Sequence, residues 1–489
     1  MKKILVSSIL LMLSFCVSAQ NDEKIIIGKK EIVYSKVLNE NRTIWIYTPN
    51  MTSKSISTDK RYPILYLLDG DAHFFSTVGI VQQLSQANGN GVLPEMIIVA
   101  IESINRIRDF VPSDDLNKAN PFVSFLSSEL IPYIDENYNT APYKLLAGHS
   151  LGGLAAIDVL TKFPDLFNAY IAIDPSMWYN NEKFLKNIIA QLPKLNMKGK
   201  RLFIGTANSM PGGMILSQLK NDKSNETQHI RSIFKLDEFL KSNTNGLLYA
   251  QKYYETERHS TVPLLSEYDG LRFIFDYYFF DAAEKDFADT TVLIASKLKK
   301  HYANVSEEMG YKNAAPEALI NYLAYDALGK KHFNKSKELF ELNIEWYPES
   351  INVYDSYADY FLAKKDTINA IVNYKKALLI KNDTIILKKL SAVTNRKALS
   401  ISINDLQKYA GIYTLEDFQL DIALEVRDGN LWAIVPGQAD DELQLISENV
   451  FTVKGKQGYT ITFQMIGNKP KGFTSVQPNG TFKAVFKNK

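Results

Sequence analysis

Short apolar runs alternate with amphipathic stretches over the first 285 residues of the chain. Uninterrupted runs are typical of strands buried on both faces of a parallel sheet, and four are found: Tyr62–Leu68, Met96–Ile101, Lys144–Ala147 and Ala169–Ile173. Helical patterns over Phe122–Tyr138 and Leu151–Lys162 lie between them. The remaining pattern predicts strands over Arg42–Pro49, Arg201–Gly205 and Leu247–Tyr254, and a closing helix over Glu267–Phe280. The alternation predicts an α/β domain over residues 20–285, with helices on both faces of the sheet.

Residues 286–397 carry helical patterns that repeat with a period of 34 residues. Ala324 matches Ala358, and Phe340 matches Tyr374. Small and large residues therefore recur where two antiparallel helices must interlock. The segment resembles tetratricopeptide repeats; because two units are few, an unrelated pair of helical hairpins is the alternative.

From residue 401 to residue 489 the apolar runs become short and partly alternating, as in Leu431–Val435 and Tyr459–Met465. The turn pairs Asp428-Gly429 and Asn479-Gly480 separate some of them, which is typical of hairpins. We expect a small antiparallel β domain here, and it offers no candidate site.

The N-terminus carries an export pattern. Two lysines precede the apolar run Ile4–Val17, which ends in the small residues Ser18 and Ala19. This order is typical of a secretory signal peptide, so residues 1–19 are predicted to be removed and the protein to be periplasmic or extracellular. The run is too short for a membrane anchor. A lipoprotein ranks second because Phe15, not a small residue, precedes Cys16. No later stretch is long enough to span a membrane.

The composition of the chain argues against several classes of function. The 489 residues include 56 Lys and Arg against 54 Asp and Glu, with one cysteine. Such a balance argues against bulk affinity for nucleic acid or anionic membrane, and one cysteine excludes a disulfide framework or a thiolate cluster. Neither a G-x-G-x-x-G fingerprint nor a Walker loop is present. We expect no cofactor and no metal.

One pentapeptide points to nucleophilic catalysis. Gly148-His149-Ser150-Leu151-Gly152 has the G-x-S-x-G form. The apolar strand Lys144–Ala147 enters it and the helix Leu151–Lys162 leaves it, which is the setting of a nucleophile elbow. Small residues permit a strained turn that exposes the Ser150 hydroxyl, and the helix N-terminus favours developing negative charge. An inert serine in a glycine turn is the alternative.

A serine nucleophile needs a base, and the chain has six histidines. His149 adjoins Ser150, but the turn is expected to direct its side chain away. His73 follows a predicted strand and is expected to line the site, whereas His229 lies in a polar segment. His259 follows the last predicted strand and keeps the order serine, acid, histidine expected on this fold. We therefore expect His259 to be the base rather than a histidine of a surface loop.

Several motifs together resemble the esterase D-like esterases, α/β hydrolases that include enterochelin esterases, feruloyl esterases and mycolyltransferases. The resemblance covers about residues 30 to 280, and a secreted subgroup with tetratricopeptide-like repeats is similar as far as residue 385. The motifs are Tyr66-Leu67-Leu68-Asp69-Gly70, Ala100-Ile101-Glu102, Arg106-Ile107-Arg108-Asp109, Gly148–Gly153, Asp174-Pro175-Ser176-Met177-Trp178 and His259 with Asp269-Gly270-Leu271-Arg272.

The resemblance implies roles for matching residues. Ser150 matches the nucleophile and His259 the general base. The backbone N–H groups of Leu151 and Asp71 match the oxyanion hole. Trp178 matches an aromatic residue of the substrate pocket, with plain packing as the alternative.

Arg106, Arg108 and Asp109 follow a predicted strand at the carboxyl edge of the sheet, where ligands bind. Arg108 is therefore predicted to read a polar or acidic substrate group. The alternative is an Arg–Asp pair that pins the loop.

The acid is harder to place. Many relatives carry a carboxylate soon after a strand that here is followed by Asn208. Others place it on a later helix, and Glu226, 33 residues before His259, fits that pattern. Glu226 is the predicted acid. Asp222 comes next, Glu257 requires a regular loop, and a serine–histidine dyad without an acid stays open.

These patterns predict an exported serine esterase that forms an acyl-enzyme. The expected substrate is a small-molecule or polysaccharide-linked ester. An acyltransferase using the same site is one alternative; a repeat-based binding protein with a degenerate hydrolase domain is the other. The helical repeats are expected to recruit a protein partner or a second copy.

Overall fold

The structure is a computed structural model. It describes residues 25–49, 60–86, 91–115, 118–288, 290, 294–394 and 401–487, except positions 417, 457, 468 and 479. The predicted signal peptide and Cys16 lie outside these residues. The described chain divides into two compact units, one up to Tyr278 and one from Phe279 onward.

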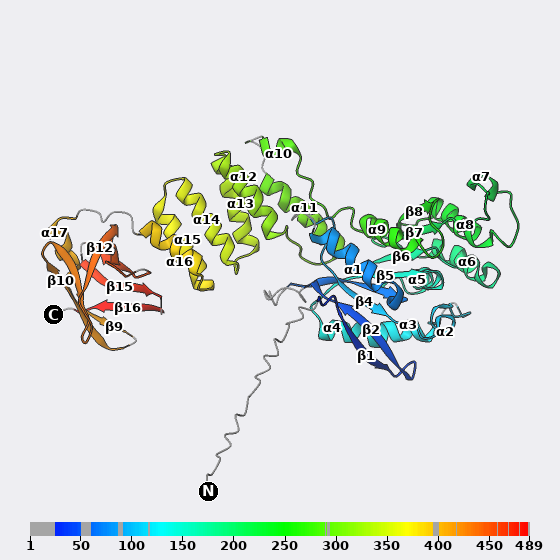
Figure 1. The fold of residues 1–489 in the computed structure, drawn as a ribbon, viewed down its shortest axis with the longest axis horizontal. Coiled ribbons are helices and arrows are strands. Elements are labelled where there is room, and N and C mark those ends of the chain that lie inside the picture. The colour runs from blue at the N-terminus through cyan, green and yellow to red at the C-terminus, as the bar shows by residue number, and fades with distance from the viewer. Residues whose placement is uncertain are drawn as a thin grey trace, which may run out of the picture. The chain divides into compact units, whose positions relative to one another are not determined.

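The first unit is built on one eight-stranded sheet with the order β1-β2-β4-β3-β5-β6-β7-β8 (Figure 1). The strands β3 to β8 are mutually parallel where they pair, whereas β1 and β2 run antiparallel at one edge. Their bounds are β1 Lys29–Ser35, β2 Glu40–Tyr47, β3 Tyr62–Leu68, β4 Ile97–Ile101, β5 Thr140–His149, β6 Ala169–Ile173, β7 Arg201–Ala207 and β8 Leu248–Tyr254. The predicted strands are all present, and β1, half of whose side chains face solvent, adds an edge strand that the apolar runs did not indicate.

Helices cover both faces of this sheet (Figure 1). Helices α1 (Gly70–Gln86) and α9 (Val262–Ile274) form one layer and pack against each other. The other layer contains α2 Arg106–Phe110, α3 Pro121–Phe125, the π turn η3 Leu126–Leu130, α4 Ile131–Asn137, α5 Leu151–Lys162, α6 Tyr179–Gln191 and α8 Gln228–Ser242; the short turns η4 Leu192–Lys194 and α7 Leu216–Leu219 lie in the connecting loops. The closing helix begins five residues earlier than predicted because Pro263 suits its first turn.

In the second unit, paired helices reproduce the 34-residue period. The helices are α10 Glu284–Ala288, α11 Ile294–Met309, α12 Glu317–Gly329, α13 Phe333–Trp346, α14 Ile351–Ala363, α15 Thr367–Ile380 and α16 Thr384–Thr394. Ala324 and Ala358 are fully buried, and the turns of both hairpins carry a left-handed lysine, Lys331 and Lys365. Two helical hairpins therefore share one geometry. Their tetratricopeptide character stays a prediction.

The C-terminal segment forms a closed antiparallel barrel of eight strands. It follows the turns α17 Ile403–Leu406 and η5 Gln407–Tyr409, and its strands are β9 Gly411–Leu415, β10 Leu420–Arg427, β11 Asn430–Ile434, β12 Asp441–Ser447, β13 Val450–Val453, β14 Thr460–Ile466, β15 Lys469–Gln477 and β16 Gly480–Phe486. Asp428 and Gly429 form a left-handed turn between β10 and β11, as predicted. The predicted turn at Asn479 falls on a residue that is not described. Tyr413, Phe451 and Phe463 are among the side chains that fill the interior.

Among the described residues, no helix is both long enough and apolar enough to cross a membrane.

Candidate active site

Three neighbouring strands of the open sheet end in strained residues. Asp69 follows β3, Ser150 follows β5 and Asp174 follows β6, with φ angles of 54°, 61° and 41°. A residue other than glycine rarely adopts such φ angles, and residues held in this backbone conformation cluster at functional sites. Because β3, β5 and β6 are adjacent and parallel, their carboxyl ends bring these residues together at one edge of the sheet.

Ser150 occupies the predicted sharp turn between β5 and α5. Its backbone N–H donates to the carbonyl of Ile173, 2.9 Å away. A Cβ atom on Gly148 would lie 2.4 Å from the carbonyl oxygen of Gly152, so the turn closes only with glycine at this position. The Ser150 hydroxyl oxygen lies 3.1 Å from that of Ser176.

His259 lies on the loop between β8 and α9 and meets a carboxylate. Its Nδ1 is 2.6 Å from Oδ2 of Asp174. Asp174 is fully buried, and its Oδ1 accepts a hydrogen bond of 2.9 Å from the backbone N–H of Ala207. Burial alone would raise the pKa of Asp174, but hydrogen bonds from His229 and His259 outweigh it and hold that pKa well below its usual range. Asp174 is therefore a carboxylate that orients the imidazole.

The acid predicted from the sequence is wrong. Glu226 is exposed on the turn before α8, and the carboxylate that meets His259 is Asp174. Among the other carboxylates considered, Asp222 accepts hydrogen bonds from Ser224 and Thr227. Asp174 still keeps the predicted chain order of serine, acid and histidine. Its position after a buried strand, like that of Ser150, was the sequence signal that could have identified it.

His229 is a functional candidate that the sequence analysis did not select. It is the second residue of α8, and its Nε2 lies 2.8 Å from the same Oδ2 of Asp174. The ring centroids of His229 and His259 are 5.2 Å apart, with the rings nearly perpendicular. One carboxylate oxygen thus holds two imidazoles. No local pattern around His229 indicates this contact.

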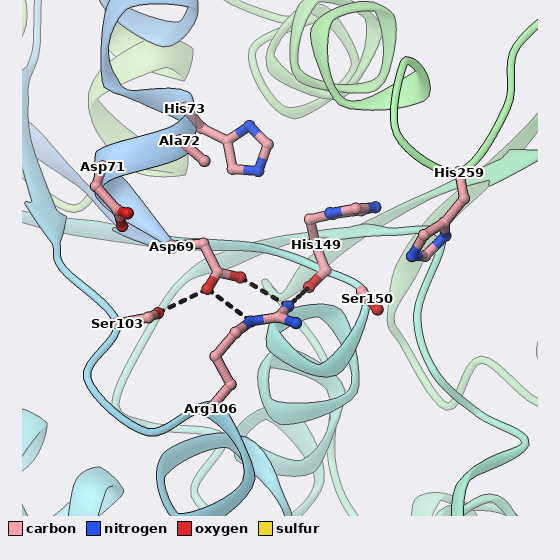
Figure 2. Close-up of a pocket in the computed structure, with 9 residues that line it drawn as sticks. All are labelled: Asp69, Asp71, Ala72, His73, Ser103, Arg106, His149, Ser150 and His259. Atoms are coloured by element: carbon pink, nitrogen blue, oxygen red, sulfur yellow. Dashed lines mark hydrogen bonds and ion pairs between the residues drawn. The ribbon is translucent and has the colours of Figure 1, made fainter.

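A pocket of about 460 Å³ lies over these groups (Figure 2). Its lining residues are Asp69, Asp71, Ala72, His73, Ser103, Arg106, His149, Ser150 and His259. Figure 2 shows Ser150 and His259 on the side of the pocket away from Asp71 and Ser103. The structure therefore brings the predicted nucleophile and base to one cavity, together with His73, as predicted.

His149 departs from its prediction, because its side chain points into the pocket instead of away from it. Its ring centroid lies 4.4 Å from that of His259 and 5.7 Å from that of His73. Burial, together with repulsion from the neighbouring histidines, lowers the pKa of His149 to about 4. A neutral His149 therefore packs beside His259 without adding a positive charge.

Arg106 connects three of the loops at this edge. Its guanidinium donates to both oxygens of Asp69, at 2.8 and 3.0 Å, and to the carbonyl oxygen of His149, at 3.2 Å (Figure 2). Ser103 donates to Oδ1 of Asp69 at 2.6 Å. The ends of β3, β4 and β5, of which β3 leads to Asp71 and β5 to Ser150, are therefore fixed relative to one another.

The structure contradicts the assignment of Arg108 to substrate. Its guanidinium makes a two-pronged ion pair with Glu40 and also donates to the buried Asp109 at 2.7 Å. Asp109 is also paired with the fully buried Arg42 at 2.8 Å. The alternative interpretation, a pair that pins the loop, is the correct one. Arg106, two residues earlier, is the arginine that lines the pocket.

The remaining predicted groups are Leu151, Asp71 and Trp178, of which Asp71 lines the pocket. Leu151 and Asp71 occupy the first turns of α5 and α1, where backbone N–H groups have no partner within the helix. Trp178, at the start of α6, is 41% exposed and contacts Tyr179. Its part in substrate binding stays a prediction.

This geometry can be compared with known proteins. Residues 35–229 match the family model described as "Putative esterase". The matched segment contains Ser150, Asp174 and His229, whereas His259 lies beyond its end. Two curated relatives come from Bacillus subtilis. Ferri-bacillibactin esterase BesA is 30% identical over 30% of this chain, and uncharacterized protein YbbA is 28% identical over 29% of it. The chain spans 58% and 59% of their lengths, respectively.

A solved structure extends the likeness in fold. An IroE-like serine hydrolase of Shewanella oneidensis is 27% identical, with a TM-score of 0.54, over 65% of this chain and 99% of the other. The sheet order, the elbow at Ser150 and these relatives agree on an esterase-like α/β-hydrolase fold for the first unit.

Proposed function

We propose that this protein hydrolyses carboxylic esters through a serine nucleophile. One observation carries the proposal: Ser150 stands on a strained turn in the same pocket as His259, whose other ring nitrogen is held by the buried Asp174. This combination of nucleophile, imidazole and carboxylate defines serine hydrolases on unrelated folds.

The hydrogen bond between His259 and Asp174 determines which ring nitrogen of His259 carries the proton. Asp174 is ionised, so Nδ1 of His259 carries the proton that bonds to it, and Nε2 is left with a lone pair. In the reaction, the Ser150 hydroxyl turns from Ser176 towards Nε2, loses its proton to it and attacks the ester carbonyl. The imidazolium then protonates the leaving alcohol, and water resolves the acyl-enzyme by the reverse sequence.

The backbone N–H groups of Leu151 and Asp71 are the proposed oxyanion donors. Each stands at a helix start, where the helix dipole also favours negative charge. Arg106 acts as a positioning residue, because its ion pair with Asp69 fixes the junction of β3 and α1, directly before Asp71 in the first turn of α1.

The proposed substrate is a small ester of the siderophore type, cleaved after export. The support is the name of the relative BesA, a ferri-bacillibactin esterase, together with a pocket lined by imidazoles, carboxylates and a guanidinium. The basic head and apolar run at the N-terminus support export.

The test is turnover of p-nitrophenyl esters of rising acyl length, followed by a catechol-bearing cyclic triester. Wild type should hydrolyse short esters, and Ser150→Ala should lose at least about 10³-fold in kcat because the nucleophile is gone. Thermal melting should show that the variant is folded. Equal turnover by both proteins would contradict the proposal, as would the absence of labelling of wild type by a fluorophosphonate probe.

A further inference from the structure

We propose that Asp174, His229 and His259 form a binding site for a divalent transition ion of the zinc class. Their ligand atoms, one from each residue, all lie within 4.8 Å of one another. Binding itself requires no catalysis. The consequence for activity, inhibition, rests on the proposed function, because the ion would occupy the same atoms that the reaction uses.

The donor set suits such an ion. Two imidazole nitrogens and one carboxylate oxygen are a combination found in zinc sites that keep a fourth position for water, whereas Mg²⁺ and Ca²⁺ prefer oxygen ligands alone. The three residues come from separate elements, the end of β6, the start of α8 and the loop after β8. They are therefore held by the tertiary structure rather than by one mobile segment.

Each imidazole can turn its Asp174-facing nitrogen into a ligand. A neutral imidazole does so by moving its proton to the other ring nitrogen. On His259 that nitrogen is Nε2. On His229 it is Nδ1, which is buried and, within the described part of the chain, has no hydrogen-bond partner. A proton placed there would be a buried donor without an acceptor, a cost that the metal bonds must exceed. The Ala207 N–H bond to Oδ1 would keep the carboxylate oriented.

The site must open slightly to take the ion. Oδ2 of Asp174 lies 2.6 Å from the His259 nitrogen and 2.8 Å from the His229 nitrogen. Zinc bonds of about 2.0–2.2 Å in tetrahedral geometry separate two ligand atoms by roughly 3.3 Å. His259 can supply this movement because it lies on a loop and 42% of its side chain is exposed. The protons of the two imidazoles and the metal ion therefore compete for the same ligand atoms.

Occupation would stop the proposed reaction. With the ion on Nδ1, the proton of a neutral His259 lies on Nε2, where the Ser150 proton must arrive. The carboxylate of Asp174 would also coordinate the ion and would no longer stabilise the imidazolium of His259. Zinc should thus inhibit by removing the base, leaving the serine and the pocket in place.

The experiment measures binding of Zn²⁺ to the full chain, with any affinity tag removed, by calorimetry and by competition with a chromophoric chelator. Wild type and Ser150→Ala should each bind one ion with equal affinity, which separates this proposal from the esterase proposal. His229→Gln should bind Zn²⁺ at least tenfold more weakly. Asp174→Asn removes a different ligand, so one of the two variants still tests the site if the other melts early. Glu226→Gln is the matched control, because this exposed residue lies three positions from His229.

Binding to wild type and Ser150→Ala that is lost in His229→Gln or Asp174→Asn, but kept in Glu226→Gln, supports the site. Failure of wild type to bind stoichiometric Zn²⁺ would overturn it. Unchanged affinity in folded His229→Gln would also overturn it, because the ion would then be held elsewhere.

Discussion

The described residues form two eight-stranded sheets that use backbone strain differently. In the open sheet of the first unit, Asp69, Ser150 and Asp174 adopt left-handed conformations at the ends of three adjacent parallel strands. In the closed barrel, left-handed residues such as Asp428 and Asn449 lie in hairpin turns between antiparallel neighbours. Parallel strands bring their ends to one edge, whereas hairpin turns alternate between the two ends of a barrel. Only the first arrangement gathers strained residues at one site.

The first unit and the barrel also differ in the charged side chains that they bury. The first unit buries Asp109, Asp174 and Arg42 almost completely. Among the described residues of the barrel, the buried polar side chains are Thr452, Thr460 and Ser475, with aromatic rings filling the rest. Buried charges are costly unless paired, so a fold retains them where they serve a pair or a site. The barrel therefore has the features of a packed module, and the open sheet those of a functional one.

The greatest predicted loss of activity distinguishes the role of Asp174 from that of Glu226. Asp174→Asn should lower kcat by about 10²- to 10⁴-fold, because an amide neither orients the imidazole nor stabilises the imidazolium. Glu226→Gln should stay within about twofold of wild type, since Glu226 is exposed. Ester hydrolysis by the two purified variants, with melting curves as a folding control, makes the comparison. A large loss in Glu226→Gln with none in Asp174→Asn would restore the original assignment.

The two arginines after β4 should separate activity from stability. Arg106→Ala should lower kcat/KM by roughly tenfold, because Asp69 loses the ion pair that holds the start of α1, where Asp71 lies. Arg108→Ala should keep kcat/KM within about twofold and lower the melting temperature by a few degrees. Arg42 still pairs with Asp109, and a partly exposed ion pair contributes only about 1 kcal/mol or less. Steady-state kinetics and thermal melts decide the matter; the reverse pattern would mean that Arg108 contacts substrate after all.

The smallest effect concerns Glu267, which lies on α9 and packs against α1. Burial raises its pKa to about 8, although hydrogen bonds from Thr77 and Ser76 act in the opposite direction. The folded protein therefore holds a proton that the unfolded chain releases near pH 4.5. The stability from this group is full below that pH and is lost as the pH rises towards 8. Glu267→Gln should flatten this decline, as melts between pH 5 and 8.5 would measure. Parallel wild-type and variant curves would contradict the prediction.

Local patterns predicted much of this molecule. The bounds of β3, β6 and α5 agree with the apolar runs and the helical pattern, since burial on both faces produces a continuous run in any parallel strand. The elbow at Ser150 was also readable, because its glycines, strand and helix lie within a few positions of one another. Glu226, Arg108 and the orientation of His149 differ from their predictions, because distance along the sequence and the neighbouring residue types do not record tertiary contacts.

Local residue patterns specify the alternation of strands and helices, the nucleophile turn and the loop that carries His259. Long-range packing is what joins Asp174 to His259, brings His229 to the same oxygen of Asp174, and pairs Arg106, rather than Arg108, with Asp69 at the pocket. These partners lie 85, 55 and 37 residues apart along the chain. Hydrogen bonds over such separations depend on which strands are neighbours and which side chains lose contact with water, and a local pattern records neither.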